Sequence, residues 1–232
     1  MAHSPTQSLA KRPSLLAPGL LVLTLVGVFG FRFTGAESID LAVQSFFWRG
    51  DHWLINPNEP IGLWLAYDGP KVLLILFALW LITVALFPHF GPAAMGRRRA
   101  LYLLACLAVV PLVCTQLRAV THMATPRELV MYQGKYAHLL LFETKPEPYP
   151  SHAFPAGHAS GGFALLGLAF AWTSHRARRI GIVIGLALGA WMGVYQIARG
   201  EHFLSHTLVT TALAWFLCVM LSRVIRPVDL AA

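Results

Sequence analysis

The feature that most constrains this chain is a series of apolar runs, each close to the ~20 residues that a helix needs to cross a bilayer. Six such runs are present: Leu15–Phe33, Val72–Phe87, Ala100–Leu117, Phe154–Thr173, Ile180–Ile197 and Phe203–Leu221. Segments that cross lipid must satisfy their own backbone hydrogen bonds, so spans of this kind are helical. The sequence therefore predicts an all-α polytopic membrane protein with six transmembrane helices.

The composition excludes a soluble single domain. Only 12% of the 232 residues are charged and 56% are apolar, whereas soluble domains carry about 25% charged residues. The net charge of +8 would suggest a nucleic-acid partner in a soluble protein, but here the basic residues fall in short loops between apolar runs. We therefore expect no nucleic acid, nucleotide or organic cofactor.

The basic clusters alternate along the chain and predict the orientation of the helices. They are Lys11/Arg12, Arg97/Arg98/Arg99, Arg176/Arg178/Arg179 and Arg223/Arg226. Because such clusters remain on the cytoplasmic side, both termini are expected inside. The first run resembles a signal peptide, but its near-membrane length and the absence of a clear cleavage site favour a retained helix. The segments expected outside are residues 34–71, 118–153 and 198–202.

Histidine collects on the expected outer side. Seven of the ten histidines lie there: His52, His122, His138, His152, His158, His202 and His206. An ionisable side chain at the end of a membrane helix indicates a functional site more often than a structural one. The chemistry is therefore expected at the outer face.

Two further patterns concern packing. The first outer segment carries aromatic residues that are typical of the headgroup zone or of a lid over a lipid entry: Phe46, Phe47, Trp48, Trp53 and Trp64. The fifth run carries a four-residue glycine repeat suited to close helix contact: Gly181, Gly185, Gly189 and Gly193. This repeat can pack within the chain or between chains, so the sequence leaves the oligomeric state open.

The three cysteines, Cys106, Cys114 and Cys218, lie inside apolar spans and are expected to be small buried hydrophobes.

Three polar segments fall at the expected outer ends of helices. The first enters the fourth run at His158, and the second ends the third run at Arg118. The third includes Arg199, His202 and His206; if the sixth helix begins near Gly200, the two histidines share one face. A metal pair is an alternative, but the H-E-x-x-H order of metalloproteases is absent and no third ligand is evident. Arginine suits phosphate oxygens, so the sequence predicts a phosphate pocket without a metal.

From the third run to the sixth, the chain resembles the type 2 phosphatidic acid phosphatase superfamily, a family of histidine phosphatases related to vanadium haloperoxidases. The family pattern is K-x6-R-P, then P-S-G-H, then S-R-x5-H-x3-D. Pro155-Ala156-Gly157-His158 matches the second motif with alanine in place of serine. Arg118 stands at the lysine of the first motif and Pro126 at its proline, while His202 matches the histidine of the third.

The chain departs from the family pattern at three positions. Thr125 replaces the arginine of the first motif, with Arg127 two residues further on. Gln196 occupies the arginine position of the third motif, and Arg199 follows within a turn. His206 stands where the family has an aspartate that orients the catalytic histidine.

The resemblance implies a phosphatase that works through a phosphohistidine. His202 would be the nucleophile and His158 the general acid. The expected phosphate-binding groups are Arg118, Arg199, Gln196, Arg127 and the backbone N–H groups of Ala156 and Gly157. His206 is expected to orient His202 if it accepts a hydrogen bond, with Glu128 or Glu201 as alternatives.

The resemblance also implies a location and a substrate class. We expect a single membrane-embedded domain over residues 1–232, with core helices at about 100–222, in a bacterial cytoplasmic (inner) membrane with the site toward the periplasm. The substrate would be a membrane lipid phosphate or diphosphate, of the undecaprenyl diphosphate, lipid A, phosphatidylglycerol phosphate or phosphatidate class. Two alternatives remain open: a phosphotransferase that uses a lipid diphosphate, and a non-catalytic lipid-binding or transport protein.

Overall fold

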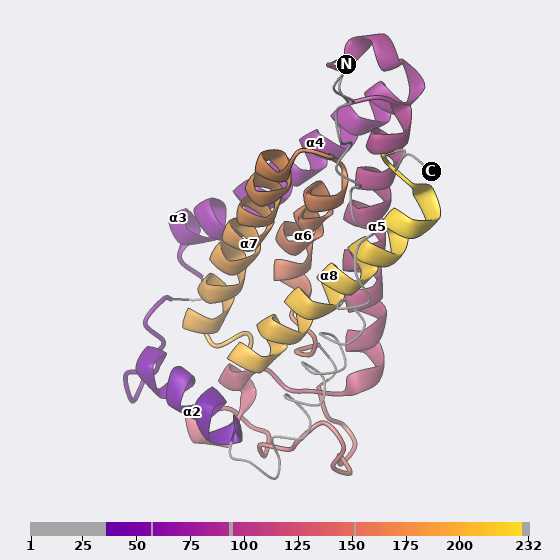
Figure 1. Cartoon of the computed structure of the whole chain (residues 1–232). Coiled ribbons are helices and arrows are strands. Elements are labelled where there is room, and N and C mark those ends of the chain that lie inside the picture. Colours follow the sequence, from indigo (N-terminus) through magenta and orange to yellow (C-terminus); the bar gives the residue numbers. More distant parts are fainter. Residues whose placement is uncertain (1–35, 57, 93–94, 151, 229–232) are drawn as a thin grey trace, which may run out of the picture.

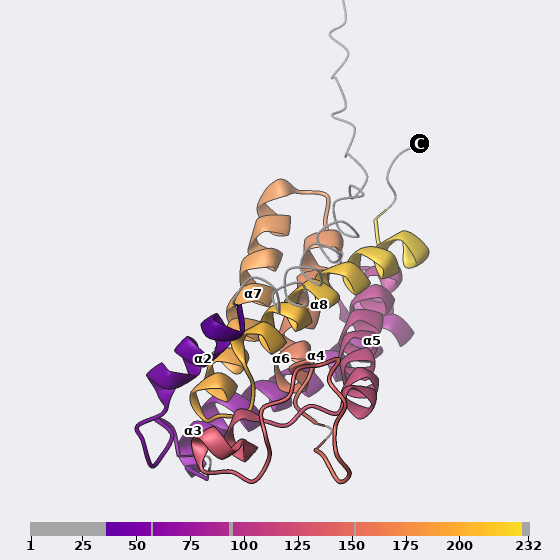
Figure 2. The same cartoon turned by 90° about the horizontal axis from the view of Figure 1, so that it is seen from below.

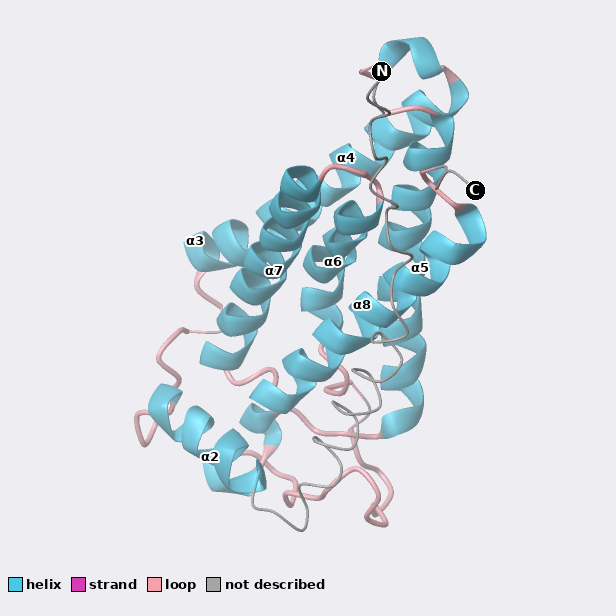
Figure 3. Cartoon of the chain, viewed as in Figure 1, coloured by secondary structure: helices cyan, strands magenta, loops and turns pink. Residues whose placement is uncertain are grey.

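The computed structural model describes residues 36–56, 58–92, 95–150 and 152–228. In this part of the chain the structure is helical, with two isolated bridges, Trp48–Trp53 and Leu129–Tyr136, and no strand (Figure 3). The expected all-α class is therefore confirmed. The first apolar run, Leu15–Phe33, lies outside the described residues.

The described part of the chain consists of α-helices, one π-helix and short 3₁₀ helices, which form one bundle (Figure 1). The longer elements are α2 (Ala36–Phe47), α4 (Gly69–Leu86), α5 (Arg97–Thr121), α7 (His175–Ala198) and α8 (Leu204–Ile225). The shorter ones are α3 (Pro60–Leu63), the π-helix η2 (Trp64–Asp68), η3 (Pro88–Phe90), η4 (Pro126–Glu128), η5 (Val130–Tyr132), α6 (Gly157–Ala164) and η6 (Leu165–Phe170). Four stretches of the described residues are long and apolar enough to cross a membrane: Pro60–Leu86, Arg97–Glu128, His175–Ala198 and Leu204–Ile225. The count of six spans and the side on which the termini lie stay predictions.

The first outer segment is shorter and more ordered than the sequence predicts. It contains α2, and its last part, from Pro60 onward, is already helical as α3 and η2 and continues into α4. Glu59 starts this helix, because its side chain accepts hydrogen bonds from the N–H groups of Ile61 and Gly62. The second span therefore begins about three turns before Val72, where the apolar run itself begins.

The fourth apolar run forms a buried centre instead of one long helix. Phe154–Thr173 contains α6, with 8 residues, and the 3₁₀ helix η6, with 6 residues. Helix α6 packs against α4, α5, α7 and α8 (Figure 1). Ala159, Phe163 and Leu166 are almost fully buried in the main core cluster, and all three cysteines are buried and free, as expected.

The glycine repeat of α7 packs within the chain. A Cβ at Gly181 would lie 2.7 Å from Leu168, one at Gly185 would lie 2.6 Å from the backbone of Leu166, and one at Gly189 would lie 2.2 Å from the ring of Phe163. Contacts this close exclude any side chain. The small-residue face therefore brings α7 against α6 and η6, which settles one of the alternatives that the sequence left open.

Filling this face is expected to destabilise the fold. Gly185→Leu would push a side chain into the backbone of η6, and such overpacking costs about 3 kcal/mol, or roughly 10 °C in the Tm of a chain of this size. Thermal unfolding of the detergent-solubilised protein measures the effect. Ile184→Leu, at a neighbouring exposed position, is the control and should leave the Tm unchanged; an equal Tm for Gly185→Leu would contradict this packing.

The arginine clusters and the histidine segments lie at opposite ends of the bundle. Arg99 at the start of α5 stacks 5.1 Å from the ring of Trp172, and Arg178 at the start of α7 donates to the carbonyl of Ala169. At the other end, which Figure 2 shows from below, α2 contacts α7 and α8, near the end of α7 and the start of α8. The basic loops and the histidine segments thus lie at different ends of the bundle, as the alternation of basic and non-basic loops along the sequence predicts.

Candidate active site

His158 lies in the first turn of α6, where Gly157 makes room for an arginine. Ala156 is the extended N-cap residue, and a Cβ at Gly157 would lie 2.5 Å from Nη1 of Arg118. Glycine is therefore required for the guanidinium to lie across the start of the helix. The N–H of Ala156 donates to the carbonyl of His206 at 3.3 Å, so this group is already used inside the protein, in contrast to its expected role as a phosphate donor.

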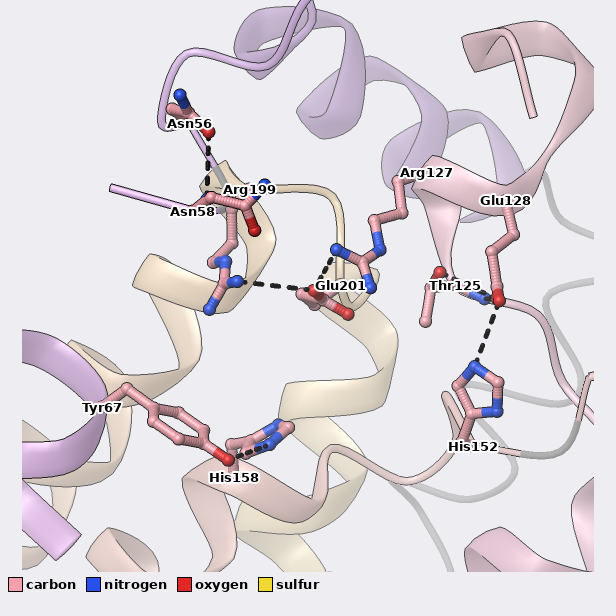
Figure 4. Close-up of polar contacts among 10 residues, drawn as sticks. All are labelled: Asn56, Asn58, Tyr67, Thr125, Arg127, Glu128, His152, His158, Arg199 and Glu201. Carbon is pink, nitrogen blue, oxygen red and sulfur yellow. Dashed lines mark hydrogen bonds and ion pairs between the residues drawn. The ribbon is translucent and has the colours of Figure 1, made fainter. Parts of the chain in front are cut away.

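Tyr67 holds the His158 ring. Its hydroxyl lies 3.1 Å from Nε2 of His158, and the two ring centroids are 4.7 Å apart (Figure 4). Nδ1 of His158 is buried and has no hydrogen-bond partner among the described residues. Tyr67 belongs to the π-helix η2, and such turns are frequent at functional sites. Nothing in the sequence of this outer segment identifies Tyr67 as a partner of His158.

His202 lies in the loop before α8 and not on the helix, because α8 begins at Leu204. The expectation that His202 and His206 share a helical face is therefore wrong. Nδ1 of His202 is 2.7 Å from the carbonyl oxygen of Ala153. A carbonyl oxygen only accepts, so Nδ1 carries the hydrogen and Nε2 has the lone pair. Nε2 is buried and has no hydrogen-bond partner among the described residues.

The surroundings of His202 keep its imidazole neutral. Burial, followed by the neighbouring His206, His158 and Arg118, lowers the pKa of His202 well below its usual value. The rings of His202 and His158 are 5.8 Å apart between centroids. At neutral pH, His202 thus presents an unprotonated nitrogen in a buried space that His158 also lines.

His206 does not take the place of the orienting aspartate. Its ring centroid is 6.0 Å from that of His202 and 5.1 Å from that of Phe154, while Nδ1 of His202 bonds to Ala153. The two glutamates considered as alternatives are also engaged elsewhere. Glu128 accepts from Thr125 and pairs with His152, and Glu201 pairs with arginines.

Two predicted phosphate-binding arginines converge on Glu201 (Figure 4). Its Oε1 is 2.9 Å from Nη1 of Arg127 and 3.7 Å from Nη2 of Arg199. Arg199 is nearly buried, whereas the Arg127 side chain is 44% exposed. Burial, followed by the nearby charges of Arg118 and Arg199, lowers the pKa of His158 to about 4, so both arginines act electrostatically on this ring.

Gln196 and Arg118 are fixed through backbone atoms. Nε of Arg118 donates to the carbonyl of His152 at 2.7 Å, which leaves the rest of its guanidinium beside Gly157. Gln196 is buried, its carbonyl accepts from the N–H of Glu201, and its side-chain Oε1 has no hydrogen-bond partner among the described residues. An oxygen atom does not donate to a phosphate, so only the amide nitrogen of Gln196 suits the predicted role.

Trp53 supports the turn that carries Arg199 and His202. Gly200 has φ +75°, and a Cβ there would lie 2.4 Å from the Trp53 ring. Trp53 is 7% exposed and packs with Trp48 and Tyr132. It is therefore not one of the interfacial anchors that the aromatic residues of this segment suggest. Phe46 and Trp64 do lie at the surface. The sequence motif spacing gave no sign of this contact.

A side chain at Gly200 is expected to displace the His202 loop. Gly200→Ala combines a strained left-handed backbone with a collision against Trp53, and we expect phosphatase activity to fall by about 100-fold, as for a 1 Å displacement of a catalytic group. Gly50→Ala is the matched control, because Gly50 has φ +95° but nothing within 4 Å of its Cβ position. Equal activities of the two variants would contradict a role for the Trp53 contact.

In the described ranges, no three His, Cys, Asp or Glu side chains are close enough to hold a metal ion. The donors of the site are instead two imidazoles and two guanidinium groups, a set that binds and attacks phosphate. The metal pair of His202 and His206 thus has no third ligand from these residues. Independence of metal stays a prediction.

Comparisons with known proteins agree with this geometry. The sequence matches the PAP2 superfamily over residues 99–228, which includes all the motif residues named above. The comparison with curated proteins found no match. Among solved structures, the chain is similar to the crystal structure of the first transmembrane PAP2 type phosphatidylglycerolphosphate phosphatase from Bacillus subtilis, with 16% identity, a TM-score of 0.55, and coverage of 92% of this chain and 97% of that one. This likeness shows a shared fold. With more than half of its residues matched by the family pattern, the chain belongs to the PAP2 superfamily.

Proposed function

We propose that this protein is an integral membrane phosphatase that removes phosphate from a lipid phosphate through a phosphohistidine on His202. The observation that carries the proposal is the hydrogen bond from Nδ1 of His202 to the Ala153 carbonyl. It fixes the tautomer in which the buried Nε2 is a free nucleophile. In a catalytic imidazole, a hydrogen bond to the nitrogen that does not react fixes the tautomer and the orientation of the ring.

In the first step, Nε2 of His202 attacks phosphorus, a P–N bond forms and the P–O bond to the lipid breaks. His158 gives its proton to the leaving oxygen, so the lipid departs with that oxygen protonated and not as an alkoxide. The anionic phosphoryl group favours the protonated form of His158, and Tyr67 holds the ring through Nε2. Arg118 and Arg199 stabilise the negative charge on the equatorial oxygens.

In the second step, water attacks the phosphohistidine. His158, now neutral, accepts a proton from that water, the P–N bond breaks and inorganic phosphate leaves. The pair of histidines is thereby restored to its starting state. Neither step requires a metal ion. The family pattern has a carboxylate at position 206, and in this chain the Ala153 carbonyl takes over its orienting role. The carbonyl brings no negative charge, so it does not replace the electrostatic effect of the carboxylate.

The Ala153 contact also bears on the non-catalytic alternative. The reason to consider a lipid-binding protein without turnover is the histidine at position 206 in place of an aspartate. Because His202 has another acceptor, this replacement no longer implies loss of the nucleophile. We therefore propose an active enzyme, embedded in the inner membrane with its site toward the periplasm, as a single domain.

The test is phosphate release from lipids by the purified protein in detergent without divalent metal. The solved relative is a phosphatidylglycerolphosphate phosphatase, so this lipid comes first, followed by phosphatidate, lipid A and undecaprenyl diphosphate. We expect release from at least one of them that is lost in His202→Ala. Strict dependence on zinc, or full activity of His202→Ala, would contradict the proposal. A labelled diphosphate donor distinguishes hydrolysis, which gives free phosphate, from transfer to a second lipid.

A further inference from the structure

Helix α2 reaches the catalytic loop through a fully buried amide. Gln44 is 0% exposed, and its Nε2 donates to the carbonyl oxygen of His202 at 2.9 Å across 158 residues of sequence. Its Oε1 has no hydrogen-bond partner among the described residues. A polar side chain buried this deeply is retained for the bond that it makes, and here only the donor half of the amide is used.

A second residue of α2 binds the other side of the same loop. Asp40 precedes Gln44 by four residues and so lies on the same face of the helix. Its Oδ1 accepts from the N–H of Ser205 at 2.9 Å, and its Oδ2 accepts from the Ser205 hydroxyl. The N-cap residue of α8 is Phe203, whose side chain makes no capping bond. Asp40 therefore supplies from another helix the anionic cap that the start of α8 lacks.

The position of His202 depends on these contacts, because the residue lies outside any helix. Its ring is held by the Ala153 carbonyl and its backbone by Gln44. One turn further, Asp40 fixes the start of α8. We propose that α2 is the positioning element of the nucleophile, with Gln44 as the positioning residue that acts through the His202 carbonyl and Asp40 as its support.

This inference rests on the proposed function, since it assigns the role of Gln44 relative to a nucleophilic His202. It gives a specific expectation for kinetics. The Gln44 donor bonds to the His202 carbonyl, whereas the arginines proposed to bind phosphate lie on α5 and beside the end of α7. Loss of the Gln44 donor should therefore slow the chemical step and leave substrate binding almost unchanged.

The first test is Gln44→Met, which keeps the length of the side chain and removes the donor. We expect kcat to fall about tenfold, because the carbonyl of His202 loses its partner and the imidazole loses its alignment, with KM within about twofold of the wild type. Ser45→Ala is the matched control in the same helix. Ser45 is exposed and its hydroxyl donates to the Ala42 carbonyl within the same helix, so this variant should have wild-type kinetics.

The second test separates positioning from general stability. In Gln44→Glu the buried carboxyl group can donate to the His202 carbonyl only when it is protonated, and burial favours the protonated form. The ratio of its kcat to that of the wild type should therefore rise as the pH falls, whereas the ratio for Gln44→Met should stay constant with pH. A purely structural role of Gln44 would instead lower the Tm of both variants and leave the kcat of the folded protein unchanged.

The outcomes are distinguishable. If the wild type and Ser45→Ala release no phosphate from any of the lipids, the proposed function fails. If they are active and Gln44→Met keeps the wild-type kcat, or loses activity only through a raised KM, the positioning role of Gln44 is wrong while the proposed function stands. A kcat ratio for Gln44→Glu that does not change with pH would equally overturn the role of the donor.

Discussion

His202→Ala is expected to reduce kcat/KM for lipid phosphate hydrolysis by about 10⁴-fold or more, as removal of a catalytic nucleophile does in enzymes that form covalent intermediates. The alanine variant lacks the buried Nε2, which the proposed mechanism uses as the nucleophile beside His158. The arginines would still bind the phosphoryl group, so the loss should appear in kcat and not in KM. Steady-state phosphate release with a lipid phosphate in detergent measures it.

The matched control is His52→Ala. His52 is an exposed histidine of the outer segment, and its Nδ1 bonds to the neighbouring Asp51. We expect this variant to match the wild type. If His202→Ala kept activity within tenfold of the wild type, the phosphohistidine route would be wrong even though the chain belongs to the PAP2 superfamily.

The apolar runs were a good guide to the long helices and a poor one to the centre of the bundle. The helices α4, α5, α7 and α8 contain, to within one residue at each end, the runs Val72–Phe87, Ala100–Leu117, Ile180–Ile197 and Phe203–Leu221. Hydropathy reports burial from water and not the kind of helix, so it could not distinguish a lipid-facing span from the short, protein-enclosed α6 and η6. It also could not predict α2, whose buried face depends on contacts with distant residues.

The candidate site could be predicted where it depends on residue type and spacing. His158, His202, Arg118 and Arg199 come together as the motif order predicts. The acceptor for His202 could not be predicted, because every residue has a backbone carbonyl and only the fold selects that of Ala153. Tyr67 and Gln44 were missed for a similar reason, since each reaches the site from a segment with no recognisable motif.

The departures from the family motif show which groups of this chain can take over the geometry that the motif residues provide. Position 206 suggested a weakened nucleophile, yet the structure gives His202 an acceptor that no substitution at a side chain can remove. The arginine missing at position 196 is likewise followed by Arg199, which Glu201 holds close to the site. In this chain, backbone and neighbouring groups supply geometry that the motif assigns to particular side chains.

The role of His158 leads to an expected result that depends on the leaving group. His158→Ala should lower turnover of a lipid phosphate about 10³-fold, because an alcohol leaves poorly without a proton donor. With nitrophenyl phosphate the leaving group departs as a stable anion, so formation of the phosphohistidine should proceed without the acid. Its hydrolysis still needs His158 as the base. The variant should therefore give a burst of nitrophenolate of about one per enzyme, followed by slow release.

Rapid mixing of the purified variant with nitrophenyl phosphate tests this expectation directly. The wild type, in which His158 serves both steps, gives the reference for burst size and for steady-state rate, and His202→Ala should show neither a burst nor turnover. Absence of the burst in His158→Ala, with equal losses for both substrates, would mean that His158 binds the phosphoryl group and does not transfer a proton. Tyr67 bonds to Nε2 of His158, and Nδ1 has no hydrogen-bond partner among the described residues. Proton transfer is therefore the expected role, with Nδ1 as the nitrogen that transfers the proton, in a ring 5.8 Å from that of His202.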